Sequence, residues 1–188
     1  MKTRSDFLTL ELRDIRLSDL PSLESWGAAI DYARYMSRLS PFCFDGSLAD
    51  QNRSFVWFAI VVDGRDSGTV WIERKPFQKD VGVLGILLAR KSLFDRGIGR
   101  AAIRRAVTIA RNALGVSSVR LHVRQTNLRA ISCYRHCGFR ITASAETTFP
   151  DGARIPFHRM ELDLAAGVPR HASPSPAHEV ELPRVSGK

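Results

Sequence analysis

The feature that most constrains the fold is a glycine-rich turn that separates an apolar segment from a basic, amphipathic one. Residues 81–89 (VGVLGILLA) are almost wholly apolar, which is typical of a central strand covered on both faces. The turn FDRGIGRA follows at 94–101, and from Gly97 to Leu114 apolar and basic residues alternate with helical spacing. A helix that begins at glycine offers unpaired backbone N–H groups and the positive end of its dipole to an anion. The pattern therefore predicts a strand, a phosphate-binding turn and a helix in succession.

Strands and helices alternate along the rest of the chain. Alternating or apolar runs predict further strands at 8–16, 54–62, 69–75, 118–124, 139–149 and 154–164. Ser18 as a cap and Pro21 in the first turn indicate the start of one helix. Further helices are expected at 28–39, 97–114 and 128–137. The expected fold class is α/β, with a mixed central sheet of about seven strands flanked by about four helices.

Length and composition indicate the domain organisation. The chain has 188 residues, of which 44% are hydrophobic, so it can bury one substantial core, and a second full domain would be cramped. We expect one domain at 1–164. The remaining residues, 165–188, hold four of the nine prolines and show no apolar period, and they are interpreted as a disordered extension.

Cysteine content and charge narrow the classes of function. The sequence has three cysteines, an odd number, and shows no secretory signal and no membrane-spanning run. These features predict a soluble cytoplasmic protein with reduced thiols. Cys133, His136 and Cys137 lack a metal-ligand spacing, so no metal site is expected. The net charge is +9, and many basic residues lie in or just before the glycine-started helix: Arg90, Lys91, Arg96, Arg100, Arg104, Arg105 and Arg111. This placement suits a polyphosphate ligand. Nucleic acid is not expected as a partner, because aromatic and basic residues are not interleaved on one sheet face.

Two common phosphate-binding motifs do not fit the turn. A P-loop ends in Gly-Lys-Ser/Thr, which is absent. A dinucleotide fingerprint needs a third glycine and an acidic residue at the end of the next strand, where Val123 and Arg124 stand. The chain instead resembles the GNAT superfamily of N-acetyltransferases. The resemblance is carried by LGILLARKSLFDRGIGRAAIRRAV, LGVSSVRLHV and NLRAISCYRHCGFR, in that order. The closing TTFPDGARIPFHRMELDL is similar to the branch that includes ribosomal-protein N-terminal and polyamine acetyltransferases.

The resemblance implies the GNAT fold, in which two central strands splay apart to admit acetyl-CoA. The pyrophosphate would rest on backbone N–H groups of the turn, and the pantetheine arm would pair with the preceding strand like an added strand. The residues implied to bind the cofactor are Ile86, Leu87, Leu88, Arg96, Gly97, Ile98, Gly99, Arg100, Ala101 and Asn127. Phe94 stands where the family often has Gln or Arg, so the turn would contact phosphate through its backbone. Asn127 is also a helix N-cap candidate, and the strand side chains are expected in the core.

Direct acetyl transfer to an amine needs a neutral amine, a stabilised oxyanion and a proton for the departing thiolate. The resemblance implies Tyr134 as the acid, and the alternative is a core aromatic residue on an apolar helix face. No carboxylate lies between Val81 and Arg90, so Glu73, one strand earlier, is the candidate general base. The alternatives are that Glu73 is an exposed surface charge and that a water chain or an unprotonated acceptor suffices.

The acceptor is expected to be a small-molecule or peptide amine. The segments that would carry its specificity, 27–51 and 143–156, hold carboxylates that would attract a cation or serve as ordinary solvated charges: Asp31, Asp45, Asp50, Glu146 and Asp151. Two other functions remain open, a catalytically weak CoA-binding module and a basic nucleic-acid-binding protein. No membrane partner is expected, and a homodimer is left open.

Overall fold

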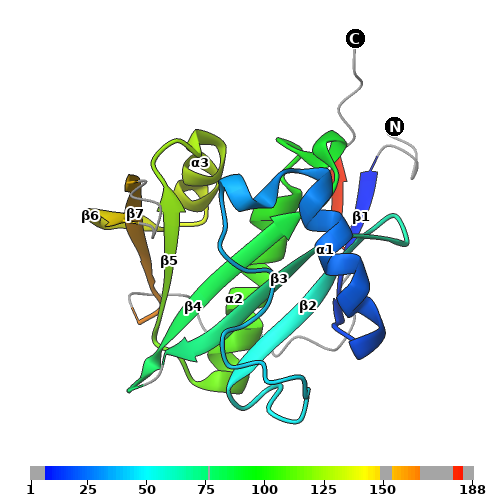
Figure 1. The fold of residues 1–188 in the computed structure, drawn as a ribbon. Coiled ribbons are helices and arrows are strands. Elements are labelled where there is room, and N and C mark those ends of the chain that lie inside the picture. Colours follow the sequence, from blue (N-terminus) through cyan, green and yellow to red (C-terminus); the bar gives the residue numbers. More distant parts are fainter. Residues whose placement is uncertain (1–6, 76, 149–153, 166–179, 184–188) are drawn as a thin grey trace.

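A mixed β-sheet forms the centre of the protein (Figure 1). The structure is a computed structural model, and it describes residues 7–75, 77–148, 154–165 and 180–183. The strands are β1 (Phe7–Asp14), β2 (Phe55–Val62), β3 (Arg65–Lys75), β4 (Gln78–Leu88), β5 (Ser118–Arg124), β6 (Arg140–Thr148), β7 (Arg154–Asp163) and β8 (Val180–Pro183). Within these residues the strand order is β6-β7-β5-β4-β3-β2-β1-β8, and only β4 and β5 pair in parallel. The predicted α/β class with a mixed sheet is confirmed.

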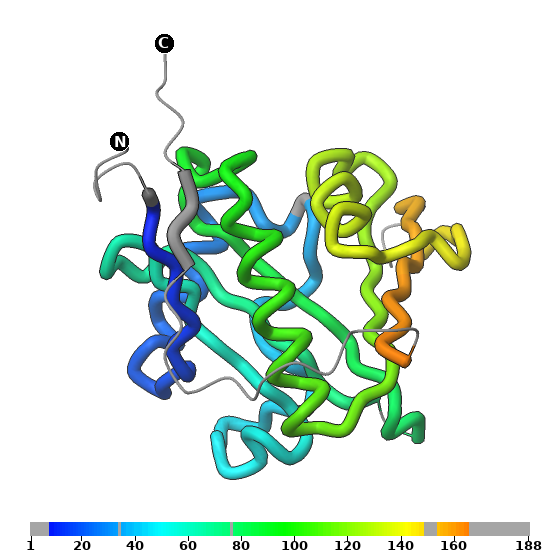
Figure 2. The backbone as a smooth tube through the Cα atoms, turned by 180° about the vertical axis from the view of Figure 1, so that it is seen from behind, coloured from blue at the N-terminus to red at the C-terminus, as the bar shows by residue number. Residues whose placement is uncertain are grey.

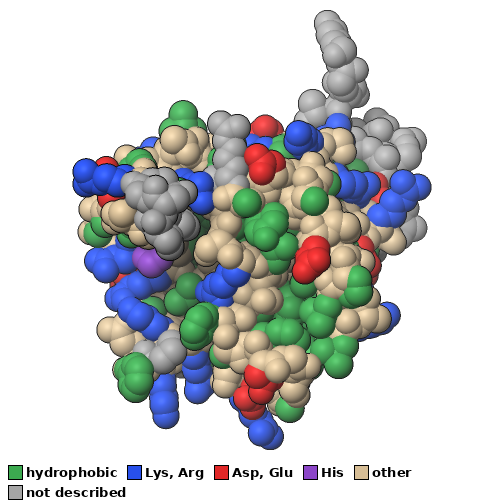
Figure 3. Space-filling view, in the orientation of Figure 1, with side chains coloured by type: hydrophobic (Ala, Val, Ile, Leu, Met, Phe, Trp, Pro, Cys, Tyr) green, Lys and Arg blue, Asp and Glu red, His purple; other side chains and the backbone are tan. Residues whose placement is uncertain are grey.

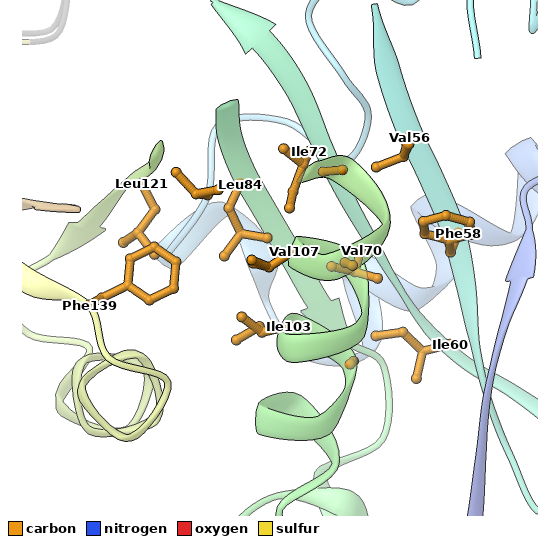
Figure 4. Close-up of a cluster of buried hydrophobic side chains, with 14 of the residues drawn as sticks. Val56, Phe58, Ile60, Val70, Ile72, Leu84, Ile103, Val107, Leu121 and Phe139 are labelled. Carbon is orange, nitrogen blue, oxygen red and sulfur yellow. The ribbon is translucent and has the colours of Figure 1, made fainter. Parts of the chain in front are cut away.

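Helices cover both faces of this sheet. They are α1 (Leu20–Ala29), α2 (Ile98–Leu114) and α3 (Leu128–His136), with 3₁₀ turns at Leu17–Asp19, Tyr32–Arg34 and Lys91–Leu93. α1 lies in front of the sheet in Figure 1, and α2 crosses the opposite face, which Figure 2 shows from behind. Because strand side chains alternate between faces, each face has its own core. Val70, Ile72 and Ile103 belong to the core under α2 (Figure 4), whereas Trp57 and Trp71 lie under α1.

β2 and β3 form a hairpin whose turn is tighter than the predicted strands at 54–62 and 69–75 imply. Asp63 and Gly64 have φ values of 50° and 70°, which are the positive angles that a two-residue type I′ turn requires. The backbone N–H of Thr9 donates to Asp63 Oδ1 at 2.9 Å, which ties the turn to β1. β3 therefore begins at Arg65, earlier than the predicted residue 69.

The two central strands part after a short stretch of pairing. Residues 81–83 of β4 pair with 118–120 of β5. Beyond that point β4 pairs only with β3, and β5 pairs only with β7, among the strands described. The edge of β4 at residues 84–88 therefore faces a gap instead of a neighbouring strand. The splayed central strands that the resemblance implied are present.

The predicted helix at 28–39 is wrong. α1 ends at Ala29, and only the short 3₁₀ turn at Tyr32–Arg34 follows within that range. Asp31 has a φ of 54°, a left-handed conformation that a continuing α-helix cannot contain. The described part of the chain therefore has three α-helices instead of four. Ser18 lies in the preceding 3₁₀ turn, and Asp19 is the N-cap residue of α1.

The interpretation of 165–188 as disordered is wrong for residues 180–183. They form β8, which pairs antiparallel with β1 and places Val180 opposite Leu10. The physical reason is that β1 pairs with β2 along one edge, so its other edge can receive a further strand. A run as short as VELP shows no period that reveals a strand. Residues 166–179 and 184–188 lie outside the described residues, and the domain boundary at 164 stays a prediction.

Candidate functional site

A cavity of about 1170 Å³ lies where β4 and β5 separate. Residues 83–88 of β4 and 122–124 of β5 form its two inner walls. The glycine turn and the first turns of α2 and α3 close one side. The loop after α1 and the β6–β7 hairpin close the other side. The gap in the sheet is thus continuous with space on both faces.

The glycine turn points backbone donors into this cavity. Gly97 is the N-cap of α2 and has a φ of 80°, a left-handed angle that glycine adopts without strain. The first bond of the helix runs from Ala101 N–H to the Gly97 carbonyl at 3.0 Å. The N–H groups of Ile98, Gly99 and Arg100 precede that bond and have no carbonyl within the helix to accept them. Together with the helix dipole they favour an anion at this position.

Most of the residues that the resemblance implied for cofactor binding meet at the cavity. Those that line it are Ile86, Leu87, Leu88, Gly97, Ile98, Gly99, Arg100 and Asn127. Arg96 lies instead at a smaller cavity beside Arg90, and Ala101 packs against the core under α2. The side chains of Ile86 and Leu88 also pack against that core, as expected, so their main chain is what faces the gap. The binding roles stay predictions.

The start of α3 reaches the same cavity. Asn127 caps this helix, because its side chain accepts a hydrogen bond from Ala130 N–H at 3.2 Å. Tyr134 lines the cavity and is half-buried, with its ring centroid 5.9 Å from that of Phe139. Burial raises the pKa of Tyr134 well above its usual value, and the neighbouring cysteine thiols raise it further. Its phenol is therefore protonated at neutral pH and can donate a proton or a hydrogen bond.

Phe94 and Arg129 form a stacked pair that the sequence analysis missed. The Arg129 guanidinium carbon lies 3.3 Å from the centroid of the Phe94 ring. Both residues line the cavity, so the pair links the glycine turn to α3 and places a positive charge beside the turn. The aromatic residue at position 94 was noted in the sequence, but no sequence pattern indicates its partner.

Glu73 is buried and fully engaged, and it does not line the cavity. Its exposed fraction is 4%. One carboxylate oxygen is paired with Arg38, and the other accepts hydrogen bonds from the backbone N–H groups of Phe42 at 2.5 Å and Cys43 at 3.2 Å. Burial and the Glu73 charge raise the pKa of the Cys43 thiol to about 11. Glu73 is therefore not an exposed charge but a tie between β3 and the loop before β2, and its role as a base stays a prediction.

His122 is a cavity residue that the sequence analysis did not select. It lies on β5, and its ring contacts that of Phe157 edge to face, with centroids 5.1 Å apart. Burial lowers the pKa of His122, and the charges of Arg159 and Lys75 lower it further. The imidazole is therefore neutral at pH 7 and able to accept a proton. The alternation of residues 118–124 could have indicated it, since it places His122 on the face opposite the buried Leu121.

The carboxylates expected near an acceptor do not reach the cavity. Among the described residues that line it, Asp95 beside the glycine turn is the only carboxylate. The predicted acceptor-loop acids Asp31, Asp45, Asp50 and Glu146 are exposed and do not line the cavity, although Asp31 and Glu146 are next in the chain to residues that do. Asp151 lies outside the described residues. The described residues of the cavity wall therefore do not include the loop carboxylates that were expected to attract a cationic acceptor.

Comparison with known families decides the relationship. The model of the family described as Acetyltransferase (GNAT) family matches residues 11–139, from within β1 to just beyond α3. The chain belongs to the GNAT acetyltransferase family. The matched span contains the splayed strands, the glycine turn and α3, so the cavity described above is the central feature of this GNAT domain. Among the described helices, none has the length and hydropathy needed to cross a membrane.

Two curated relatives resemble part of the chain. Aminoglycoside N(6')-acetyltransferase type 1 of Klebsiella pneumoniae is 35% identical over 91 residues, which is 47% of this chain and 43% of that protein. The kanamycin resistance protein of Rhizobium radiobacter is 33% identical over 92 residues, 48% of this chain and 80% of that protein. The chain thus spans less than half the length of the first relative.

Solved structures share the GNAT fold at low sequence identity. The aminoglycoside acetyltransferase AAC(6')-Ib in complex with coenzyme A superposes with a TM-score of 0.64 at 21% identity, covering 84% of this chain and 96% of that one. Spermidine N-acetyltransferase from Vibrio cholerae, in complex with CoA and spermine, gives a TM-score of 0.68 at 19% identity, covering 83% and 96%. At these identities the likeness concerns the fold.

Proposed function

We propose that this GNAT domain transfers an acetyl group from acetyl-CoA to a primary amine by direct attack in a ternary complex. The observation that carries the proposal is the cavity, which joins the amino end of α2 to the unpaired edge of β4. Two structures with the same fold were solved with coenzyme A. The curated relatives are an aminoglycoside acetyltransferase and a kanamycin resistance protein. Their names support amine acetylation as the class of reaction.

The residues present fit a long phosphorylated ligand. The cavity of about 1170 Å³ is larger than the roughly 300–1,000 Å³ of an ordinary small-molecule site, which leaves space for an acceptor as well. The N–H groups of Ile98, Gly99 and Arg100 would hold the pyrophosphate, and the guanidinium groups of Arg100 and Arg129 would add charge. The main chain of β4 at 84–88 would receive the pantetheine amides as it would an added strand.

Tyr134 is the proposed acid. When bound, acetyl-CoA supplies an acetyl thioester, and its sulfur must gain a proton as the product thiol leaves. Tyr134 lines the cavity and retains its proton at neutral pH, because burial raises its pKa. It can therefore hold a proton at its hydroxyl oxygen until the thiolate forms.

His122 is the proposed base, in preference to the sequence candidate Glu73. A protonated amine cannot attack, so a neutral group near the acceptor must take its proton. His122 lines the cavity and is neutral, because its pKa is lowered. Glu73 would first have to leave Arg38 and two backbone N–H groups before it could accept a proton.

The test combines CoA binding with acceptor turnover. Thermal melting with CoA measures binding, and release of free CoA from acetyl-CoA with a panel of primary amines measures transfer, with the N-acetyl product identified by mass spectrometry. We expect stabilisation by CoA and turnover of at least one class of amine. Stabilisation without turnover would favour a CoA-binding module that lacks catalysis, and the absence of both would refute the proposal.

A further inference from the structure

We propose that the acceptor is a small amine that also carries an anionic group beside an apolar one, as an apolar amino acid does, with the anion bound by Arg124. The proposal rests on the acetyl transfer proposed above and specifies its substrate. It reverses the cationic acceptor that the loop sequences suggested.

The acceptor wall of the cavity is the face of β5 turned away from α2. Leu121 and Val123 are buried in the core under α2, so His122 and Arg124 point to the opposite face. On that face the cavity is lined by the loop after α1 and by the β6–β7 hairpin. The glycine turn and α2 lie on the other side of the sheet (Figure 2). A cofactor that enters from α2 therefore leaves this wall for the second substrate.

The charge of the acceptor wall is positive. Glu73 and Glu161 lie on the same face of the neighbouring strands and are paired with Arg38 and Arg120. Asp163 is on that face as well, but it stands at the far end of β7, opposite Ser118 and four residues from His122 along β5. Lys75 and Arg159 lie close enough to His122 to lower its pKa. Figure 3 shows Lys and Arg side chains gathered around a His side chain on the left of this face. An acceptor with several positive charges would meet repulsion here, whereas an anionic group would be attracted.

Arg124 is placed to bind that anion. One of its terminal nitrogens donates to the Ala33 carbonyl at 3.0 Å, which holds the side chain between β5 and the loop after α1. A guanidinium has five N–H donors in a planar fork, so further donors remain for a carboxylate. Arg124 stands two residues from His122, about 6–7 Å along the strand, so one small molecule can place its anion at Arg124 and its amine at His122.

The rest of the wall is apolar and aromatic. The residues that contribute are Tyr32, Tyr35, Met36, Trp71, Ile155 and Phe157. The indole ring of Trp71 packs directly against Gly85 of β4, where the Cβ atom of any other residue would lie 2.1 Å from it. This surface suits an apolar side chain, which together with the charges defines the class of substrate.

The test uses two acceptors that differ in one charge, phenylalanine and phenylalaninamide, with spermidine and kanamycin as polycations. The rate of CoA release gives kcat/KM for each acceptor, and only the deprotonated fraction of the amine is counted as substrate. We expect phenylalanine to exceed the amide and both polycations by about tenfold or more, the size of a charge-assisted contact. Arg124→Gln should abolish the preference. Arg135→Gln, a change at an exposed α3 residue that does not line the cavity, should preserve it. Equal rates for the acid and the amide, or faster turnover of a polycation, would overturn the proposal.

A binding measurement separates failure of this inference from failure of the proposed function. If no amine is acetylated, binding of phenylalanine and of phenylalaninamide to the CoA-loaded protein is measured by calorimetry. Tighter binding of the acid, lost in Arg124→Gln, would support the anion site although the transferase function had failed. Equal or tighter binding of the amide, or binding of neither, would refute the anion site itself.

Discussion

Two glycines at opposite ends of α2 allow the cofactor site to be tested against a matched control. Gly97 is the N-cap and lines the cavity, with a φ of 80°. Gly115 is the C-cap with a φ of 68°, and a Cβ atom added there would meet nothing within 4 Å. Alanine at either position would be forced into the left-handed region. Only Gly97→Ala would place a methyl group at the turn where phosphate is proposed to approach the backbone.

The magnitudes follow from that geometry. Each alanine should cost about 1–2 kcal/mol of folding free energy. For a chain of 188 residues, a loss of 1 kcal/mol lowers Tm by about 2–4 °C. Both variants should therefore melt about 2–8 °C below the wild type without ligand. CoA at a hundred times its Kd stabilises by about 2.7 kcal/mol. A tenfold weaker Kd at the same CoA concentration would halve that stabilisation, a loss of about 1.4 kcal/mol.

The assay is thermal melting of the wild type, Gly97→Ala and Gly115→Ala over a series of CoA concentrations. We expect similar Tm values for the two variants without CoA, a full CoA-dependent rise in Gly115→Ala and a rise reduced by half or more in Gly97→Ala. The same CoA-dependent rise in all three proteins would refute the placement of phosphate at the start of α2.

The remaining predictions concern catalysis and stability. Tyr134→Phe should lower turnover about ten- to ten-thousandfold without changing the CoA-dependent rise in Tm, and wild-type turnover would reject the acid role. His122→Asn should lower turnover most near neutral pH and less at high pH, where the amine is already neutral, whereas an equal loss at every pH would indicate a packing role. Glu73→Gln should lower the free energy of unfolding by about 1–3 kcal/mol, because it breaks the pair with Arg38, and a loss of turnover at unchanged stability would instead assign the base to Glu73. Removal of 180–188 should lower Tm but leave CoA affinity unchanged, since β8 pairs with β1, away from β4 and β5; an unchanged Tm would mean that β8 adds no stability.

Local patterns in the sequence predicted most of the elements because their causes are local. The glycine at 97 adopts the left-handed angle that its position before a helix requires, and α2 ends before Gly115, as predicted. Alternation placed β5 at 118–124 without error. The failure at 28–39 is also local in origin, because a left-handed Asp31 stops the helix and no sequence pattern marks that angle.

The composition of the cavity wall was decided by tertiary structure. Alternation predicts which residues of a strand share a face, but what covers that face depends on pairing between distant segments. Glu73 and His122 both lie on strand faces turned away from α2. The loop carrying Arg38 covers Glu73, whereas the parting of β4 and β5 leaves His122 at the cavity. β8 arises in the same way, since the open edge of β1 and not the residues of VELP gives that segment its partner. The sequence by itself determined most of the strands and helices and which side chains of a strand share a face, because neighbouring residues decide these. Only the tertiary structure decided which of those faces lines the cavity, because that depends on contacts between distant segments.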